Sequence, residues 1–261
     1  MLTNEQICHF YNAGYLAISE PLLKAEEIAR LRAIYDEMFE AQAGREQGNH
    51  FDPAGADEDE APAKLSQILQ PQRYRPDILG DYVDLIAEIG CQLLGPKART
   101  EIFHAILKPA GHGAPTPWHQ DEAYWDPTRQ YRSISFWLPL QDATVENGCM
   151  WFMDRSHEWE VLAHQSIGGD PRVHGLELVD PGVITSPVAA PLSATGLTIH
   201  SNRTAHYTGP NTTTAPLRAL ILGVTLEDLP YPTQRRFPWN DRKQTRRDER
   251  QCAAAAGGSN R

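Results

Sequence analysis

The sequence has few of the features that mark secreted, membrane-spanning or nucleic-acid-binding proteins. It has only four cysteines, all widely separated, so neither a disulfide framework nor a cysteine zinc site is expected. Positive charge is also scarce: 24 lysines and arginines against 34 acidic residues give a net charge of −10, which argues against nucleic acid or an anionic membrane as a partner. No apolar run approaches the roughly 20 residues of a membrane span, and the N-terminus lacks the pattern of a signal peptide. These absences predict a cytoplasmic protein.

The composition suits one globular domain. Hydrophobic residues make up 41% of the chain, and we assign a single domain to residues 1–242. Residues 1 to about 95 are expected to form a helical layer, because Thr3 and Gln6 make a plausible capping box and apolar residues three and four apart predict helices over 24–43 and 77–94. The acidic residues 50–63 between these helices are expected to form a loop near a site.

From about residue 100 the sequence changes to short β-rich runs separated by Gly, Pro and Asn turns. These runs are EIFHAILK, RSISFWLPL, GCMWFM, GLTIHS and LRALILGVTL. Strands at this spacing without intervening helices indicate a β-sandwich or barrel, so we expect a mainly β jelly-roll core over about 100–228 behind the N-terminal helices. Residues 243–261 are basic and then of low complexity, and are expected to be a disordered tail.

The clearest chemical signal lies in TPWHQDEAYW, residues 116–125. On a β-strand residues i and i+2 share a face, so His119 and Asp121 would present a nitrogen and a carboxylate oxygen to one space. This pair supplies two-thirds of the facial triad that holds non-haem Fe(II). A second histidine is needed from a distant strand, and HSNRTAHYTGPN offers both His200 and His206. On residue type alone, the two histidines remain alternatives.

Arg218 lies twelve residues after His206, at the start of the strongly apolar run LRALILGVTL. A buried unpaired charge is costly, so an anion should meet this guanidinium. The 5-carboxylate of 2-oxoglutarate is such an anion, because a guanidinium binds a carboxylate through two parallel hydrogen bonds. The His-x-Asp pair, a late histidine and this arginine together predict a site for iron and 2-oxoglutarate.

The chain also resembles the phytanoyl-CoA dioxygenase family of Fe(II)/2-oxoglutarate oxygenases. The likeness runs from about residue 3 to residue 226. It lies in four ordered stretches: LTNEQICHFYNAGYLAI, ILKPAGHGAPTPWHQDEAYW, WLPLQDATVENGCMWFMDRSH, and TIHSNRTAHYTGPN followed by Arg218. The resemblance implies a double-stranded β-helix (a cupin-like jelly roll) with N-terminal helices. The chain departs from the family pattern in two turns, at residues 154–157 and 196–197.

By this likeness the iron ligands are His119, Asp121 and His206, since the family has its ligand just before the Gly-Pro-Asn turn, and Arg218 anchors 2-oxoglutarate. Further contacts with the cosubstrate are implied at Lys64, Gln67, His104, Gln120 and Trp137.

The resemblance implies Fe(II), 2-oxoglutarate and O2 as cofactors, and oxidation of an unactivated C–H bond of a small organic molecule with release of succinate and CO2. Relatives that halogenate lack the carboxylate of Asp121, so hydroxylation is favoured. The aromatic residues Tyr124, Trp125, Trp137 and Trp151 suggest a small, partly apolar substrate, such as a product of secondary metabolism or an amino-acid derivative. Two alternatives stay open: a cupin-type metal enzyme of another reaction class, and a catalytically silent binding module on the same scaffold.

Overall fold

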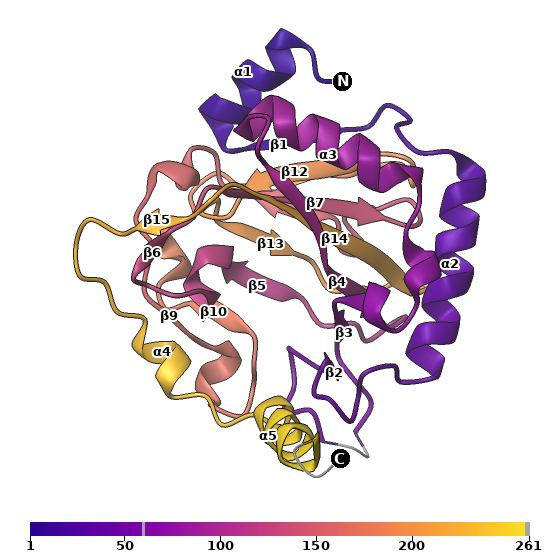
Figure 1. Ribbon diagram of the computed structural model, residues 1–261, viewed down its shortest axis with the longest axis vertical. Helices are drawn as coiled ribbons and strands as arrows, with labels where there is room; N and C mark the ends of the chain where they lie inside the picture. The colour runs from indigo at the N-terminus through magenta and orange to yellow at the C-terminus, as the bar shows by residue number, and fades with distance from the viewer. Residues whose placement is uncertain (59–60, 259–261) are drawn as a thin grey trace.

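The computed structural model describes residues 1–58 and 61–258, and in them two antiparallel sheets enclose a cavity (Figure 1). The larger sheet contains, in spatial order, β1 (Tyr15–Ile18), β12 (Leu197–Ser201), β7 (Ser133–Pro139), β14 (Leu217–Thr225), β4 (Arg99–Lys108), β3 (Ser66–Leu69) and β2 (His50–Phe51). The smaller sheet contains β11 (Val188–Ala190), β8 (Met150–Phe152), β13 (His206–Thr208) and β5 (Thr116–His119). Two short pairs flank them: β10 (Leu176–Leu178) with β9 (His164–Ser166), and β15 (Leu229–Pro230) with β6 (Arg129–Gln130). The mainly β jelly roll expected from the sequence is thus confirmed.

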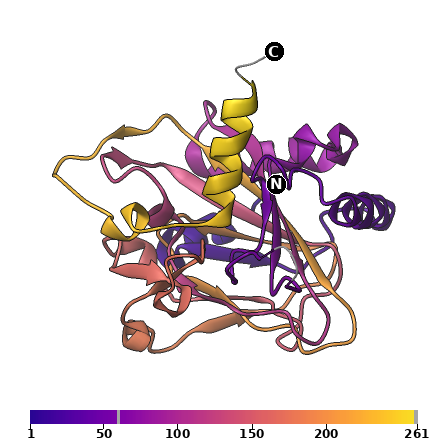
Figure 2. The same ribbon diagram turned by 90° about the horizontal axis from the view of Figure 1, so that it is seen from below.

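The N-terminal helices cover the outer face of the larger sheet (Figures 1 and 2). They are α1 (Asn4–Ala13), α2 (Ala25–Glu40) and α3 (Asp81–Leu94). The capping box at Thr3 is present, with both reciprocal bonds to Gln6. Pro76 lies before α3 and begins a separate short 3-10 turn, Pro76–Ile78.

Alternation along β14 separates the two faces of the larger sheet. Leu220, Leu222 and Val224 are fully buried against the helical layer. The approach of α3 is close: a Cβ on Gly90 would come within 2.5 Å of a methyl carbon of Val224, so only glycine fits there. The residues between them face the space between the sheets, so the inner face is free to line a cavity.

The C-terminal segment corrects part of the expected disordered tail. After α4 (Pro238–Asp241), residues Arg246–Gly258 form the helix α5, which lies beside the turn that precedes β2 (Figure 2). Thr245 caps this helix by accepting from the backbone N–H of Asp248, and Arg250 pairs with Asp57. These contacts stabilise a segment that composition alone marked as unstructured. Residues 259–261 lie outside the described range, and the single domain over 1–242 stays a prediction.

The expected loop over 50–63 contains the short strand β2, and residues 59–60 lie outside the described range. Asp52 organises this segment, since its carboxylate accepts from the backbone N–H groups of Ala54, Lys64 and Leu65. In the described part of the chain, no helix has the length and apolar character needed to cross a membrane.

Candidate metal centre

Two histidines and one aspartate converge between the sheets. His119 ends β5, His206 begins β13, and the two residues pair across the smaller sheet. Asp121 is not on the strand, as the spacing argument assumed, but opens the short 3-10 helix Asp121–Tyr124. One ligand atom from each of the three lies within 4.8 Å of the others, and within the described residues this is the set found to suit a metal ion.

Backbone carbonyls fix the orientation of both imidazoles. The distance from His119 Nδ1 to the carbonyl oxygen of Pro117 is 2.8 Å, and that from His206 Nδ1 to the carbonyl oxygen of Thr204 is 2.9 Å. A carbonyl oxygen can only accept, so each Nδ1 carries the proton and each Nε2 has a free lone pair. These two Nε2 atoms lie 3.7 and 3.5 Å from Oδ1 of Asp121. Three donor atoms therefore face one point.

The other oxygen of Asp121 is held by neighbours. Its Oδ2 accepts from the Ser135 hydroxyl at 3.0 Å and lies 3.3 Å from Nε2 of His200. His200 thus contacts the carboxylate oxygen that the other two imidazoles do not approach, although its ring centre lies 4.4 Å from that of His206. The structure places His206 in the ligand cluster and His200 in a supporting position, which resolves the alternative left by residue types.

Burial and mutual charge set the protonation of this cluster. Burial lowers the pKa of His119, and lowers that of His206 well below its ordinary value. Burial acts to raise the pKa of Asp121, but His206, His200 and His119 outweigh it and lower that pKa. At neutral pH the cluster therefore holds two neutral imidazoles and one carboxylate, the forms that bind a metal.

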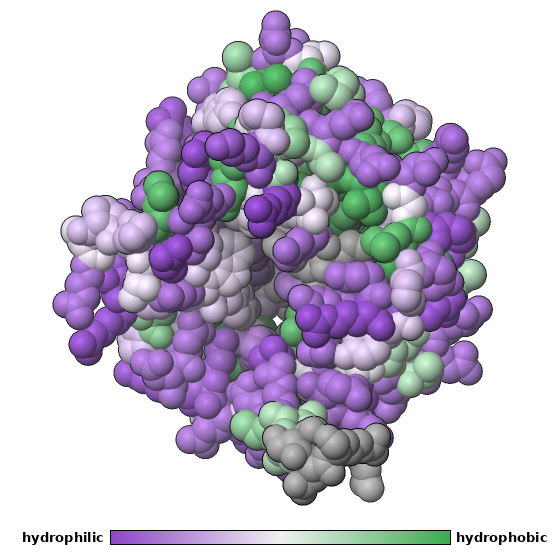
Figure 3. Space-filling view, viewed as in Figure 1, coloured by the Kyte–Doolittle hydropathy of each residue, from purple (hydrophilic) through white to green (hydrophobic). Residues whose placement is uncertain are grey.

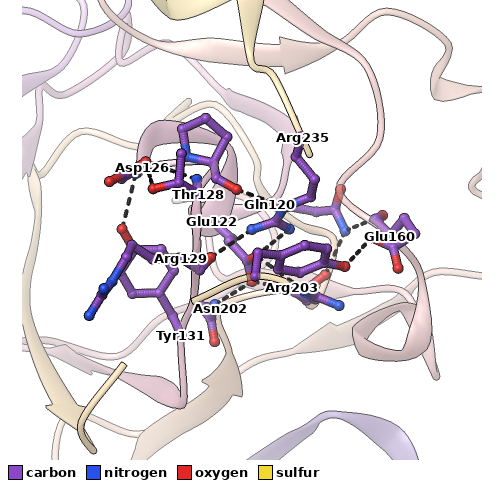
Figure 4. A network of polar contacts seen from close by, with 12 residues as sticks. Gln120, Glu122, Asp126, Thr128, Arg129, Tyr131, Glu160, Asn202, Arg203 and Arg235 are labelled. Carbon is purple, nitrogen blue, oxygen red and sulfur yellow. Dashed lines mark hydrogen bonds and ion pairs between the residues drawn. The ribbon is translucent and has the colours of Figure 1, made fainter. Parts of the chain in front are cut away.

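A network of polar contacts surrounds Glu122, the chain neighbour of Asp121 (Figure 4). Glu122, only 1% exposed, accepts from Arg203 at 2.8 Å, from Arg235 at 2.7 Å and from the Asn202 amide at 2.9 Å. It joins the turn that carries Asp121 to the segment just before β13. No local sequence pattern marks Glu122, because its arginine partners lie about 80 and 110 residues away.

The cluster opens into a cavity of roughly 830 Å³. The molecular surface is hollowed near the middle of the face in Figure 3. Five of the side chains singled out from the sequence line the cavity, namely Gln67, His104, Tyr124, Trp125 and Trp137, whereas Trp151 does not.

Two expected contacts of the cosubstrate lie elsewhere. Gln120 is fully buried away from the cavity: its amide donates to the carbonyl of Arg203 at 2.9 Å and accepts from the N–H of Leu162 at 2.8 Å. It points away from the cavity that its neighbours His119 and Asp121 line. Lys64 is exposed and does not line the cavity. Both assignments are therefore corrected.

Arg218, the expected anchor, points to the outer face of the larger sheet. Its guanidinium pairs with Asp36 of α2, with Nη2 at 2.7 Å and Nε at 2.8 Å from Oδ1. Leu217, Ala219 and Ile221 line the cavity instead. Since alternate residues of a strand face opposite sides, Arg218 cannot share their face. The anion that this arginine meets is a side chain of the helical layer, and its assignment to 2-oxoglutarate is wrong in this structure.

A different cation lies on the inner face. Lys108 is 2% exposed, lines the cavity, and donates to the Thr208 hydroxyl at 2.7 Å and to the Gly209 carbonyl at 2.6 Å. Burial lowers its pKa to about 7. No carboxylate pairs with this ammonium within residues 1–58 and 61–258. Lys108 is thus a buried cation whose hydrogen-bond partners are neutral.

A double-stranded β-helix that presents two histidines and an aspartate to an internal cavity defines the class of 2-oxoglutarate-dependent non-haem iron oxygenases. Comparison with known proteins agrees. The profile of the family described as phytanoyl-CoA dioxygenase (PhyH) matches residues 10–219. The chain belongs to this family.

Individual relatives support the same conclusion. The chain is 33% identical to EvdO2 from Micromonospora carbonacea var. aurantiaca, whose crystal structure superposes with a TM-score of 0.77 over 92% of this chain and 97% of that one. It is 26% identical over 235 residues to the probable alpha-ketoglutarate-dependent hypophosphite dioxygenase of Stutzerimonas stutzeri, covering 86% of this chain and 79% of the relative. The epimerase SnoN, 22% identical with a TM-score of 0.67 over 87% and 85% of the chains, shares the fold.

The family and the metal cluster together identify the cofactors. EvdO2, which is 33% identical, has been crystallised with 2-oxoglutarate, and SnoN with Fe3+, alpha-ketoglutarate and nogalamycin RO. The His-Asp-His cluster and the membership of the PhyH family give iron and 2-oxoglutarate as the cofactors of this chain, which is a 2-oxoglutarate-dependent dioxygenase.

Proposed function

We propose that the chain hydroxylates an unactivated C–H bond of a small organic molecule, with iron held by His119, Asp121 and His206. The observation that carries this proposal is the convergence of two neutral Nε2 atoms and one carboxylate oxygen on one point. A two-histidine, one-carboxylate set leaves three coordination positions for cosubstrate and oxygen chemistry. The carboxylate of Asp121 fills the place that halogenating relatives leave open, which favours hydroxylation.

The inner face fits 2-oxoglutarate through Lys108 and Thr208. The Thr208 hydroxyl accepts from Lys108, so its own proton is available for a carboxylate oxygen. A strand advances about 3.3 Å per residue, so Thr208 lies roughly 7 Å from His206 along β13. A five-carbon diacid that reaches the metal with one end can therefore meet Lys108 with the other. The uncompensated charge of Lys108 supports this pairing, because a buried cation is costly until an anion meets it.

The other side chains act by position. Bound iron and 2-oxoglutarate supply the oxidation of a C–H bond by O2, with release of succinate and CO2. Ser135 and His200 hold Asp121 so that Oδ1 stays directed at the metal. Trp137 and His104 line the same cavity and are proposed to wall the bound cosubstrate and exclude water.

The cavity supports a substrate of moderate size. Roughly 830 Å³ lies within the range of pockets that hold drug-sized ligands, and Tyr124, Trp125 and Trp137 give it aromatic walls. We infer a partly apolar molecule, such as a product of secondary metabolism or an amino-acid derivative. The name of the Stutzerimonas relative gives hypophosphite as its substrate, so small anions belong in the same screen.

The four cysteines are unpaired in the structure, and Cys8 and Cys252 are exposed. Exposed free thiols persist in a reducing compartment. This supports the cytoplasm as the proposed location.

The proposed function is tested by anaerobic titration of the purified protein with Fe(II) and 2-oxoglutarate. Chelation of Fe(II) by the keto acid gives a weak visible charge-transfer band, and aerobic turnover with a screened substrate gives succinate and a hydroxylated product. Asp121→Ala should lose the band because a metal ligand is missing, whereas Asp36→Ala, on the outer side of the sheet, should retain it.

Two results would contradict the proposal. A normal band and normal turnover in Asp121→Ala would remove Asp121 from the ligand set. Absence of the band in the wild-type protein, with no succinate formed, would favour another metal enzyme of cupin type or a silent binding module.

A further inference from the structure

The C-terminal segment contributes two cations to the cavity. Lys243 and Arg247 both line it, although they lie about 20 residues beyond the end of the core strand β14 (Leu217–Thr225). The Arg247 side chain is 18% exposed, and Lys243 is half-buried with Nζ 4.7 Å from the centre of the Tyr124 ring. Both charges are thus largely withdrawn from water at one end of the site.

These cations lack the anions that would compensate them. Among the described residues, Lys243 makes no salt bridge, and the only one of Arg247 is a 3.5 Å contact with its chain neighbour Asp248. Within residues 1–58 and 61–258, the buried Nε of Arg247 has no hydrogen-bond partner, and neither has Nδ1 of His174, which lines the same cavity. Two polar nitrogens with unmet hydrogen bonds and two cations with weak or no pairing therefore border one space.

The position of this cluster is fixed by the docking of α5. Arg250, one turn after Arg247, pairs with the 7%-exposed carboxylate of Asp57. Gly48 has φ +69°, and a Cβ there would come within 2.5 Å of the Arg247 carbonyl oxygen, so the helix lies directly against this turn. The backbone N–H of Gln244 donates to the carbonyl of Pro171 at 2.8 Å. The segment is held on both sides of Arg247, so its cations do not trail freely in solvent.

The pKa values of Lys243, Arg247 and His174 also indicate a site that favours an anion. Burial lowers the pKa of Lys243 to about 8 and also lowers that of Arg247. Burial, followed by the charges of Lys243, Arg247 and His104, lowers the pKa of His174 well below its usual value. The local potential is positive although the chain carries a net charge of −10. A site of this kind gains free energy when an anion enters it.

We propose that Lys243 and Arg247, assisted by His174, bind an oxoanionic group of the substrate, whose apolar body lies against the aromatic walls toward the metal centre. The substrate is then a small organic acid, carrying a carboxylate or a phosphate-type group, and α5 is part of its binding site. The assignment of this anion as the substrate rests on the proposed function, whereas the anion-binding site itself does not. The cosubstrate has a separate cation, Lys108, on β4.

The test measures anion binding to the full chain loaded anaerobically with Fe(II) and saturating 2-oxoglutarate. Isothermal titration calorimetry is run with inorganic phosphate, benzoate and benzamide, the last as a neutral analogue of benzoate. The variants are Lys243→Met, Arg247→Gln and the double variant. Arg246→Gln is the matched control. This substitution removes the same charge from the same helix, but the Arg246 side chain is 59% exposed and lies outside the cavity.

Wild-type protein should bind benzoate or phosphate saturably and benzamide at least tenfold more weakly. Each single variant should raise the Kd of the anion about tenfold, and the double variant more, because a charge-assisted contact is lost. The control should match wild type. Preference for benzoate or for phosphate identifies the type of acid.

Equal anion affinity in wild type and double variant, an equal loss in Arg246→Gln, or no saturable anion binding would each overturn the inference. The visible band of the Fe(II)–2-oxoglutarate complex is followed in every sample. Its retention in the double variant shows that the metal site is intact, and it also separates the two proposals: a failure of the oxygenase assignment removes the band from wild type as well.

Discussion

The two faces of the seven-stranded sheet give two cations, Arg218 and Lys108, opposite environments. On the outer face Arg218 reaches Asp36, whose side chain is 57% exposed, so solvent screens the pair. On the inner face Lys108 is 2% exposed and has neutral oxygens around it. A cation near the metal centre in sequence can therefore be proposed as a cosubstrate anchor only when it is known which face of the sheet the side chain occupies.

The difference follows from register. Leu217 pairs with Lys108 across β14 and β4, and both face the cavity. Arg218, the next residue, therefore turns to the helical layer. Residues one step apart on a strand therefore face either the cavity or the helical layer.

The largest effect is expected at Glu122, where charge is buried most completely. Glu122→Gln should lower the free energy of unfolding by about 3–5 kcal/mol, because it leaves Arg203 and Arg235 buried without their shared carboxylate. Urea unfolding measures this value. Asp36→Asn on the outer face is the control, with an expected loss of about 0–1 kcal/mol. Similar losses of unfolding free energy in Glu122→Gln and Asp36→Asn would show that the buried network and the outer ion pair do not differ in energy.

Lys108→Met tests the inner face directly. Methionine keeps the apolar stem and removes the charge, so the Kd for 2-oxoglutarate should rise about 30- to 1000-fold, which corresponds to losing roughly 2–4 kcal/mol of charge-assisted binding. The anaerobic charge-transfer titration measures it with Fe(II) saturating. An unchanged Kd would place the anchor elsewhere in the cavity.

The pH dependence of 2-oxoglutarate binding also tests whether Lys108 is the anchor. With the pKa of Lys108 at about 7, its binding form is the ammonium below that pH, and above it each binding event must take up a proton. The Kd should therefore rise with pH above 7, up to about tenfold per unit. Cys149 is the titratable neighbour that acts on Lys108, and its own pKa is raised by burial.

Stability supplies a second readout of this titration. Because the pKa of Lys108 is lowered in the folded state, the unfolded chain binds one more proton between pH 7 and the ordinary lysine pKa of about 10.4. The free energy of unfolding of the cofactor-free protein should therefore gain a contribution that increases with pH in that window. Lys108→Met should remove this component, and an identical pH slope in the variant would contradict the assignment.

The smallest effect is expected on the outer face. Arg218→Met should leave the Kd for 2-oxoglutarate within about twofold of wild type and cost about 0–1 kcal/mol of stability, since the pair with Asp36 is partly exposed. The same titration and urea unfolding measure both quantities. A large rise in the Kd would show that Arg218 turns inward when the cofactors bind, and would reverse the comparison.

The sequence predicted several features because each depends on residues close together. The capping box at Thr3 needs only Gln6, and the short spacing from His119 to Asp121 brings both to one space even though the strand ends between them. The choice between His200 and His206 came from the family likeness, and the structure shows its physical reason in the Oδ2 contact of His200.

Other features depend on distant contacts that no local pattern reveals. Glu122 meets arginines from two later segments, and α5 is ordered through Asp57, nearly 200 residues earlier. Disorder was expected for this segment because its composition lacks an apolar face. Arg246–Gly258 is nevertheless helical, because charged residues such as Arg250 pair with distant side chains. Lys108 is the last residue of the apolar run EIFHAILK. No local pattern predicts that it lies beside Thr208, 100 residues later.

By itself the sequence determined the class of fold and the pair His119 and Asp121, since strand periodicity and residue chemistry are local properties; the third ligand, His206, came from the family likeness. Tertiary structure decided which cations reach the cavity. Strand register turned Arg218 outward and Lys108 inward, and the docking of α5 brought Lys243 and Arg247 to the cavity. Those outcomes depend on which faces pack together, and packing is settled only when the whole chain has folded.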